Sequence, residues 1–153
     1  MDFLQYMDLS PTLPLLFTLS FLAATVLPIG SEWLLILLLM KGHPPVFTVL
    51  TATFGNYLGG CTTFLIGIWG SDMIIKKILR LQTSDLNRAK QLYGKYGSWS
   101  LLLSWLPIVG DPLCLLAGIL KTGFFRFSIL VFSGKFLRYA TLAYLVTSGS
   151  ARQ

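Results

Sequence analysis

Long apolar blocks, at residues 13–40, 46–69, 99–120 and 124–147, occupy most of this chain. A helix needs about 20 apolar residues to cross the hydrocarbon core of a bilayer, and each block reaches that length. A mean hydropathy of +0.71, with only 12% charged residues, excludes an ordinary soluble domain. We therefore predict an all-α integral membrane protein.

Two of these blocks contain a break with an acid four residues after a proline. LPIGSE at 27–32 aligns residue for residue with LPIVGD at 106–111, so Glu32 and Asp111 correspond. Proline removes a backbone donor and glycine loosens the chain, so a straight helix is not expected through either element. An acid at membrane depth is costly and marks a candidate functional site. The predicted hinge residues are Pro28, Gly30, Pro107, Gly110 and Pro112.

The first block, at 13–40, has two interpretations. It is either one span longer than a bilayer requires, or a re-entrant hairpin of two short helices joined near Pro28. Non-helical backbone at membrane depth is tolerated where protein or a water-filled cavity covers it. We prefer the hairpin, because the break falls near the middle of the block.

The chain is predicted to form a single membrane domain over residues 1–153. Half one covers 13–70 and half two covers 99–148, and a linker at 71–98 joins them. In the linker, apolar residues at helical spacing alternate with cations, which predicts an amphipathic helical pair on the membrane surface, the second helix starting at Thr83. Because cytoplasmic loops are rich in Lys and Arg, we place the linker in the cytoplasm.

Half two repeats the pattern of half one: a broken acidic block, a turn and a span. If both broken blocks are re-entrant, the halves are antiparallel and form an inverted repeat, the arrangement of many secondary transporters. The two broken tips would then meet near the midplane from opposite faces. On the span at 46–69, Gly55 and Gly59 have the spacing that permits close helix packing.

The formal charges expected within the membrane are Glu32, Asp111, Lys135 and Arg138, which sum to zero. Lys135 and Arg138 are three residues apart and share one face of a helix. One interpretation is a structural ion-pair network. The other is a binding site, in which both cations hold an anionic group, Asn56 donates a hydrogen bond and the acids exchange protons. Both interpretations stay open on the sequence alone.

The net charge of +6 indicates an acidic partner. Because most cations lie in one segment beside apolar blocks, we expect membrane lipids with anionic head groups as partners, and no nucleic acid. The sequence contains no Cys/His metal-ligand pattern, no nucleophile–base pair and no phosphate loop, so we expect neither a metal, a cofactor nor an enzyme. A homo-oligomer is left open.

Several motifs together resemble a known family, over about residues 15 to 147. The motifs that carry the resemblance are Leu27-Pro28 with Glu32, Gly55-Asn56-Tyr57-Leu58-Gly59-Gly60, Ser104-Trp105-Leu106-Pro107-Ile108-Val109-Gly110-Asp111-Pro112 with Ala117-Gly118, and Gly134-Lys135 with Arg138-Tyr139. On these motifs, the sequence is similar to the YqaA-type branch of the DedA membrane proteins, which belong with the SNARE-associated or VTT-domain proteins.

This resemblance implies a multi-pass protein of the bacterial inner membrane with two re-entrant helices. It also implies that the protein moves anionic lipids, phospholipids or polyprenyl phosphates, with coupling to the proton gradient. Glu32 matches the embedded acid of the family, whereas Gly60 stands where larger members carry an aspartate and Gly110-Asp111 where they carry an arginine. The alternative function is a non-transporting scaffold that supports envelope or membrane-protein homeostasis.

Overall fold

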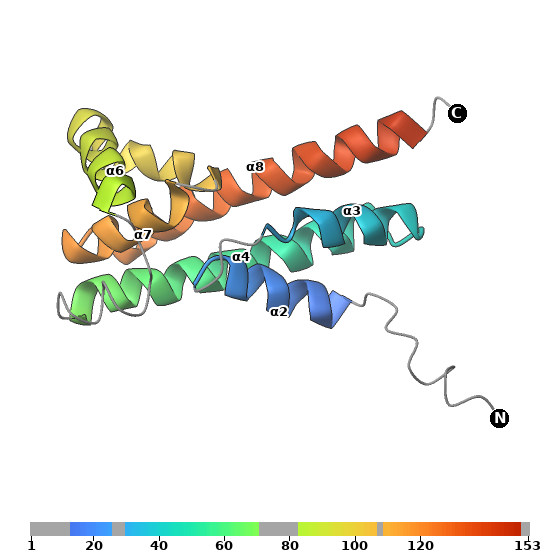
Figure 1. The fold of residues 1–153 in the computed structure, drawn as a ribbon, viewed down its shortest axis with the longest axis horizontal. Coiled ribbons are helices and arrows are strands. Elements are labelled where there is room, and N and C mark those ends of the chain that lie inside the picture. The colour runs from blue at the N-terminus through green and yellow to red at the C-terminus, as the bar shows by residue number, and fades with distance from the viewer. Residues whose placement is uncertain (1–12, 26–29, 71–82, 107–108, 151–153) are drawn as a thin grey trace.

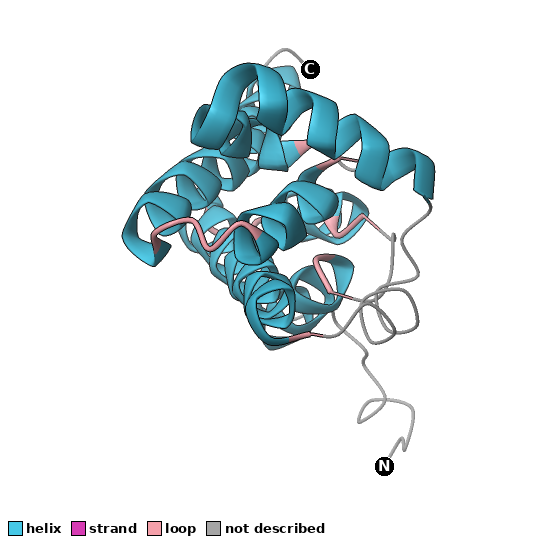
Figure 2. Ribbon diagram, turned by 90° about the vertical axis from the view of Figure 1, so that its left-hand side faces the viewer, coloured by secondary structure: helices cyan, strands magenta, loops and turns pink. Residues whose placement is uncertain are grey.

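A computed structural model of the chain describes residues 13–25, 30–70, 83–106 and 109–150. These residues form helices and connecting loops (Figure 2), which confirms the all-α prediction. In chain order the helices are α2 (Leu13–Ala23), α3 (Glu32–Met40), α4 (Pro45–Trp69), α6 (Thr83–Tyr96), the 3₁₀ helix η1 (Gly97–Trp105), α7 (Gly110–Ile119) and α8 (Phe124–Ser150).

The two long helices, α4 and α8, lie side by side and run in opposite directions (Figure 1). Aromatic side chains join them: the Phe64 and Phe127 rings stack with their centroids 4.2 Å apart. The Tyr57 hydroxyl donates a hydrogen bond of 2.7 Å to Ser128. Both helices were predicted within a few residues of their observed bounds.

Within the described residues, one helix, Phe124–Gly149, is both long and apolar enough to cross a membrane on length and composition. Leu13–Ala23 and Gly110–Ile119 are shorter apolar helices. Helix α4 has the length, but its threonines, glycines and Asn56 lower its hydropathy. Large apolar side chains are nevertheless exposed on the outer faces of the helices, as expected for contact with lipid. They include Trp33, Phe54, Leu58, Leu65, Phe125, Ile129, Leu137 and Leu145.

Each broken block consists of two short helices instead of one long one. Helix α2 runs towards the middle of the molecule and α3 runs back to the same end (Figure 1). From the opposite end of the molecule, helix η1 likewise runs towards the middle and α7 runs back to that end (Figure 1). The chain therefore does not form one continuous helix over 13–40, because helix α2 ends at Ala23 and α3 begins only at Glu32.

The second broken block begins with a 3₁₀ helix, a difference from the expected α-helix. At about 2.0 Å per residue, the nine residues of η1 extend about 18 Å. The eleven residues of α2 extend about 16 Å at 1.5 Å per residue. The two inward helices thus have similar lengths despite their different numbers of residues.

The short helices pack crosswise on the long ones. Within each half, α2 lies against α4 and η1 lies against α8, whereas α3 packs mainly on α8 and α7 on α4. One apolar core therefore contains Leu34, Leu35 and Leu38 of α3 together with Tyr139 of α8. The other contains Leu113 and Cys114 of α7 with Phe64 of α4. Each half covers part of the other.

Glycines on α4 let the neighbouring backbones approach closely. A Cβ atom at Gly55 would lie 2.5 Å from the Phe17 carbonyl oxygen, and one at Gly59 would lie 2.5 Å from that of Phe21. No side chain fits at either position, so the predicted close packing at the Gly55–Gly59 pair is confirmed, with α2 as the partner.

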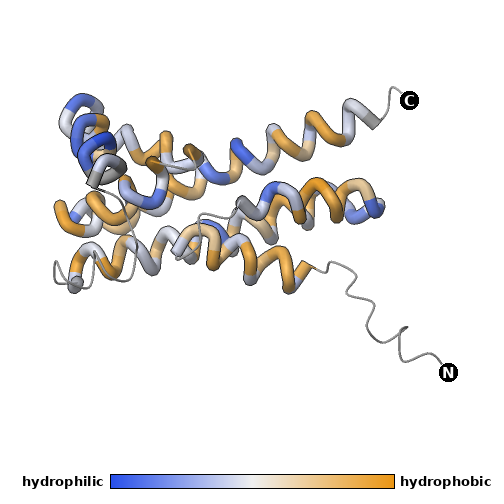
Figure 3. Tube along the Cα trace, in the orientation of Figure 1, coloured by the Kyte–Doolittle hydropathy of each residue, from blue (hydrophilic) through white to orange (hydrophobic). Residues whose placement is uncertain are grey.

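Helix α6 lies across one end of the bundle (Figure 1). Ala89 is buried and Leu92 packs against the core, while Arg88 and Lys90 are exposed. The amphipathic helix predicted from Thr83 onward is therefore confirmed, and residues 71–82 of the linker lie outside the described part. Figure 3 shows the contrast between this hydrophilic helix and the apolar bundle, whose long helix α8 has hydrophilic positions near its middle.

Candidate functional site

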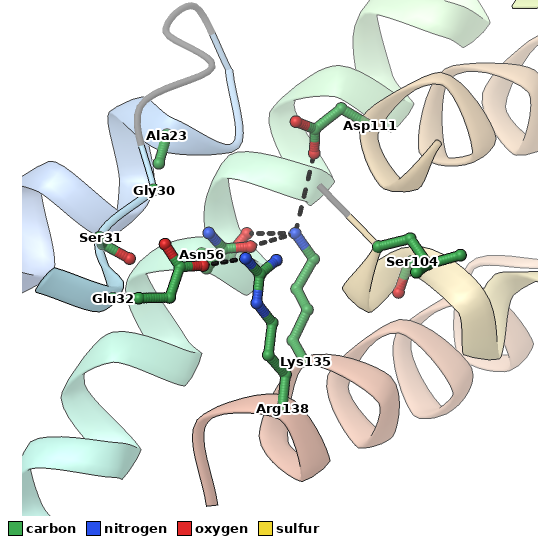
Figure 4. A pocket seen from close by; sticks show the side chains of 10 residues that line it. Ala23, Gly30, Ser31, Glu32, Asn56, Ser104, Asp111, Lys135 and Arg138 are labelled. Carbon is green, nitrogen blue, oxygen red and sulfur yellow. Dashed lines mark hydrogen bonds and ion pairs between the residues drawn. The ribbon is translucent and has the colours of Figure 1, made fainter. Parts of the chain in front are cut away.

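Two cationic side chains project side by side from the middle of α8. Lys135 and Arg138 are one turn apart, and Figure 4 shows both side chains directed into the space between the broken elements. Glu32 lies on one side of this space and Asp111 on the other. The structure thus brings together the four embedded charges that the sequence singled out.

Arg138 joins the ends of two short helices. Its Nη2 atom donates a hydrogen bond to Glu32, the first residue of α3. Its Nη1 atom donates one of 2.6 Å to the carbonyl oxygen of Trp105, the last residue of η1. An acid at a helix N-terminus and a cation at a helix C-terminus both complement the helix dipole. This contact therefore holds the two tips together at α8.

Lys135 has a more enclosed environment, since only 3% of its side chain is exposed. Its Nζ atom donates hydrogen bonds to the Asn56 side-chain oxygen and, at 3.2 Å, to the Asn56 carbonyl oxygen. Asp111 lies 3.9 Å away as an ion-pair partner. This distance is too long for a direct hydrogen bond, so the interaction is mainly electrostatic.

Asn56 holds Lys135 in place. Its side-chain nitrogen donates a hydrogen bond of 3.1 Å to the Ser20 carbonyl oxygen of α2, while its side-chain oxygen accepts from Lys135. Both ends of the amide are therefore occupied within the protein. The amide nitrogen has a second N–H, so the role predicted from sequence, donation to a bound anion, would use that remaining donor while the bond to Ser20 stays.

A polar pocket of about 40 Å³ lies between these groups. It has room for a few water molecules, but not for a lipid head group. The Ser104 side chain lines it, and the hydroxyl is buried with no hydrogen-bond partner in the described part of the chain. The remaining lining residues are Ala23, Gly30, Ser31, Glu32, Asn56, Leu106, Asp111, Lys135 and Arg138.

The predicted hinges have different positions. Gly30 lines the pocket just before α3, and Gly110 begins α7, where an added Cβ atom would collide with the Ser104 carbonyl oxygen. Pro112 lies in the first turn of α7, where a proline removes no helical hydrogen bond. Pro28 and Pro107 lie outside the described residues.

Sequence reasoning missed several contributors. The Trp105 carbonyl carries no side-chain signal, and its contact with Arg138 depends on where η1 ends. Ser31 and Tyr139, which form a buried hydrogen bond of 2.7 Å, are each next to a predicted charge. Their adjacency to Glu32 and Arg138 could have suggested this second link between α3 and α8. Within the described ranges, no cluster of three or more His, Cys, Asp or Glu residues could hold a metal ion.

An all-helical bundle with apolar outer faces and a charge-balanced polar pocket at its centre is typical of an integral membrane protein. The sequence profile of the VTT domain matches residues 11–148. The chain therefore belongs to the VTT-domain family, the DedA or SNARE-associated membrane proteins.

Relatives of nearly the same length support this assignment. The chain is 42% identical over 136 residues to inner membrane protein YqaA of Escherichia coli, covering 88% of this chain and 90% of that protein. The same values hold for inner membrane protein YqaA of Shigella flexneri. An uncharacterized protein of Haemophilus influenzae is 39% identical over 140 residues, with 86% and 85% coverage. No solved structure matches the chain significantly. The protein is a multi-pass protein of the inner membrane.

Proposed function

We propose that this protein moves an anionic lipid, a phospholipid or a polyprenyl phosphate, across the inner membrane, with coupling to protons. The observation that carries the proposal is the pocket itself. Two acids and two cations converge where the broken elements meet, at the middle of the long helices. Membrane-embedded charges of this kind commonly mark a substrate or proton path.

The proposed architecture is an inverted repeat with two re-entrant hairpins. Helix lengths support it: α3, with nine residues, and α7, with ten, extend only about 14–15 Å, half of the ~30 Å hydrocarbon core. Helices α4, with 25 residues, and α8, with 27, extend about 37–40 Å and are long enough to cross. The crosswise packing supports it as well. The second short helix of each half packs on the long helix of the other half, α3 on α8 and α7 on α4.

In the proposed mechanism, Glu32 and a lipid phosphate compete for Arg138. A phosphate accepts two parallel hydrogen bonds from a guanidinium, as a carboxylate does. Protonation of Glu32 would free Arg138 for the phosphate, and deprotonation on the other side would displace it. Asp111 would compete with the phosphate for Lys135 in the same way. The cycle breaks no bond in the lipid and needs no cofactor.

Reconstitution in liposomes tests the proposal directly. Purified protein should move a fluorescent anionic phospholipid or a polyprenyl phosphate between leaflets, and a pH gradient should set the direction. A neutral lipid with the same chains serves as the control. If no such lipid moves at any pH gradient, the transport proposal fails and the scaffold function takes its place. Hydrolysis of the lipid phosphate would instead indicate an enzyme.

Topology provides a second test. The hairpin architecture puts the linker and Lys121 on one side of the membrane, the cytoplasmic side. The contact of 2.6 Å between the hydroxyls of Tyr93 on α6 and Thr122 beside Lys121 supports this placement. Single cysteines at Lys77 and Lys121, in a chain lacking Cys61 and Cys114, should both resist a membrane-impermeant thiol reagent in intact cells. Labelling of position 121 alone would contradict the hairpin architecture.

A further inference from the structure

A groove of about 720 Å³ lies between η1 and α8, next to the polar pocket. We propose that this groove binds one hydrocarbon chain of an anionic lipid, whose phosphate lies at Arg138. The inference rests on the proposed lipid transport and assigns it a binding site. The apolar walls of the groove consist of Leu102, Leu103, Trp105, Leu137 and Leu142.

The groove and the polar pocket share two lining residues, Glu32 and Arg138. One ion pair therefore separates an apolar space from a polar one, which is the polarity profile of an amphiphile. The volume of the groove lies within the roughly 300–1,000 Å³ typical of small-molecule sites. The polar pocket, at about 40 Å³, has no room for a chain. Of the two spaces beside Arg138, only the groove can therefore hold a chain of a lipid bound there.

We assign the lipid head group to Arg138 instead of Lys135 for two reasons: the Arg138 side chain is more exposed, and it has N–H donors to spare. The Arg138 side chain is 21% exposed, against 3% for Lys135. A guanidinium has five N–H donors, and in the described part of the chain its acceptors are Glu32 and the Trp105 carbonyl. A phosphate could take the place of Glu32 while the bond to Trp105 remains. The Lys135 ammonium is already held by Asn56 and Asp111.

The groove opens towards the surrounding lipid. Leu137 is 61% exposed and Trp105 is 42% exposed, so a chain could enter sideways from the bilayer. Exchanging one hydrocarbon environment for another gives little net driving force. Selective occupancy must therefore come from the charged end of the groove. A neutral lipid with the same chain should show no preference for it.

Photocrosslinking in liposomes tests this site. The probe is phosphatidic acid with a diazirine in one acyl chain, and the crosslinked residues are mapped by mass spectrometry. We expect labels concentrated at 102–105 and 137–142, and competition by unlabelled phosphatidic acid. Arg138→Gln should lower this labelling roughly tenfold, because a hydrogen bond between charged groups is lost. The matching diacylglycerol probe should label all lipid-facing positions of α8 evenly.

Thr141→Trp should reduce the groove labelling by filling the space, since Thr141 is an exposed lining residue. Ile129→Trp is the matched control, because Ile129 is exposed on the same helix and lines neither the groove nor the polar pocket. Even labelling by the acidic probe, unchanged in Arg138→Gln, would overturn the assignment. Lipid transport without groove labelling would reject this site alone. Groove labelling without transport would reject only the transport function.

Discussion

Lys135→Met is expected to lower the stability of the protein by about 3 kcal/mol, near the lower end of the roughly 3–5 kcal/mol for a broken buried ion pair. Methionine fills similar space but leaves Asp111 without its cation and the Asn56 side-chain oxygen without its donor. The lower end applies because 30% of the Asp111 side chain is exposed. Thermal melts in detergent measure the loss, and Asp111→Asn in the same chain should recover part of it.

Moving the carboxylate from position 111 to position 60 tests the same ion pair more specifically. A Cβ atom at Gly60 would lie 3.6 Å from the Lys135 ammonium and 3.5 Å from the Cys114 sulfur, both ordinary contacts. An aspartate at position 60 could therefore replace Asp111 as the ion-pair partner. Gly60→Asp should rescue the stability of Asp111→Asn but not that of Lys135→Met. Purely additive losses in these combinations would show that the groups do not interact.

Glu32→Gln is expected to abolish the response of lipid movement to a pH gradient while preserving lipid binding. Glutamine keeps the shape of the side chain but cannot exchange a proton, and it no longer competes as a carboxylate for Arg138. In the wild-type protein, an acidic compartment should favour lipid binding on its own side, because protonated Glu32 releases Arg138. Flux in proteoliposomes under imposed pH gradients measures the response.

Arg138→Gln should weaken anionic lipid binding roughly tenfold or more, because the charged donor is lost. Arg126→Gln is the matched control, since Arg126 is an exposed cation on the same helix. Equal loss of binding in the two arginine variants would indicate general surface attraction instead of a site.

For the Glu32→Gln prediction, the contradicting outcome is different. A Glu32→Gln protein whose lipid movement still follows the pH gradient would exclude Glu32 as the coupling group.

The chemistry of the site was largely predictable from sequence, because charges within apolar blocks are rare and costly. Glu32 and Asp111 stood out by their shared distance from a proline, and Lys135 and Arg138 by their spacing on one helix face. Few alternative partners exist for charges at membrane depth. Their mutual pairing was therefore predicted, whereas the choice of Glu32 for Arg138 and of Asp111 for Lys135 was not.

The remaining details depend on tertiary packing that has no local sequence signal. The crosswise contacts of α3 and α7 follow from the meeting of both halves, and no single block encodes them. The 3₁₀ form of η1 also could not be anticipated, because its residues are compatible with an α-helix. Asn56 was predicted only as a hydrogen-bond donor to a bound anion. Its hydrogen bonds with both Ser20 and Lys135 depend on how three helices are placed relative to one another.

The pairing of Glu32 with Arg138 has a consequence for biosynthesis. The two residues are 106 positions apart, so the ribosome makes Glu32 long before its partner. At about 5–20 residues per second, the interval is roughly 5–20 s. During that time α3 has neither the guanidinium nor the face of α8 on which it packs. Until α8 is made, the first half therefore holds Glu32 without the cation that pairs with it in the finished fold. The ion pair thus distinguishes a completed chain from a truncated one.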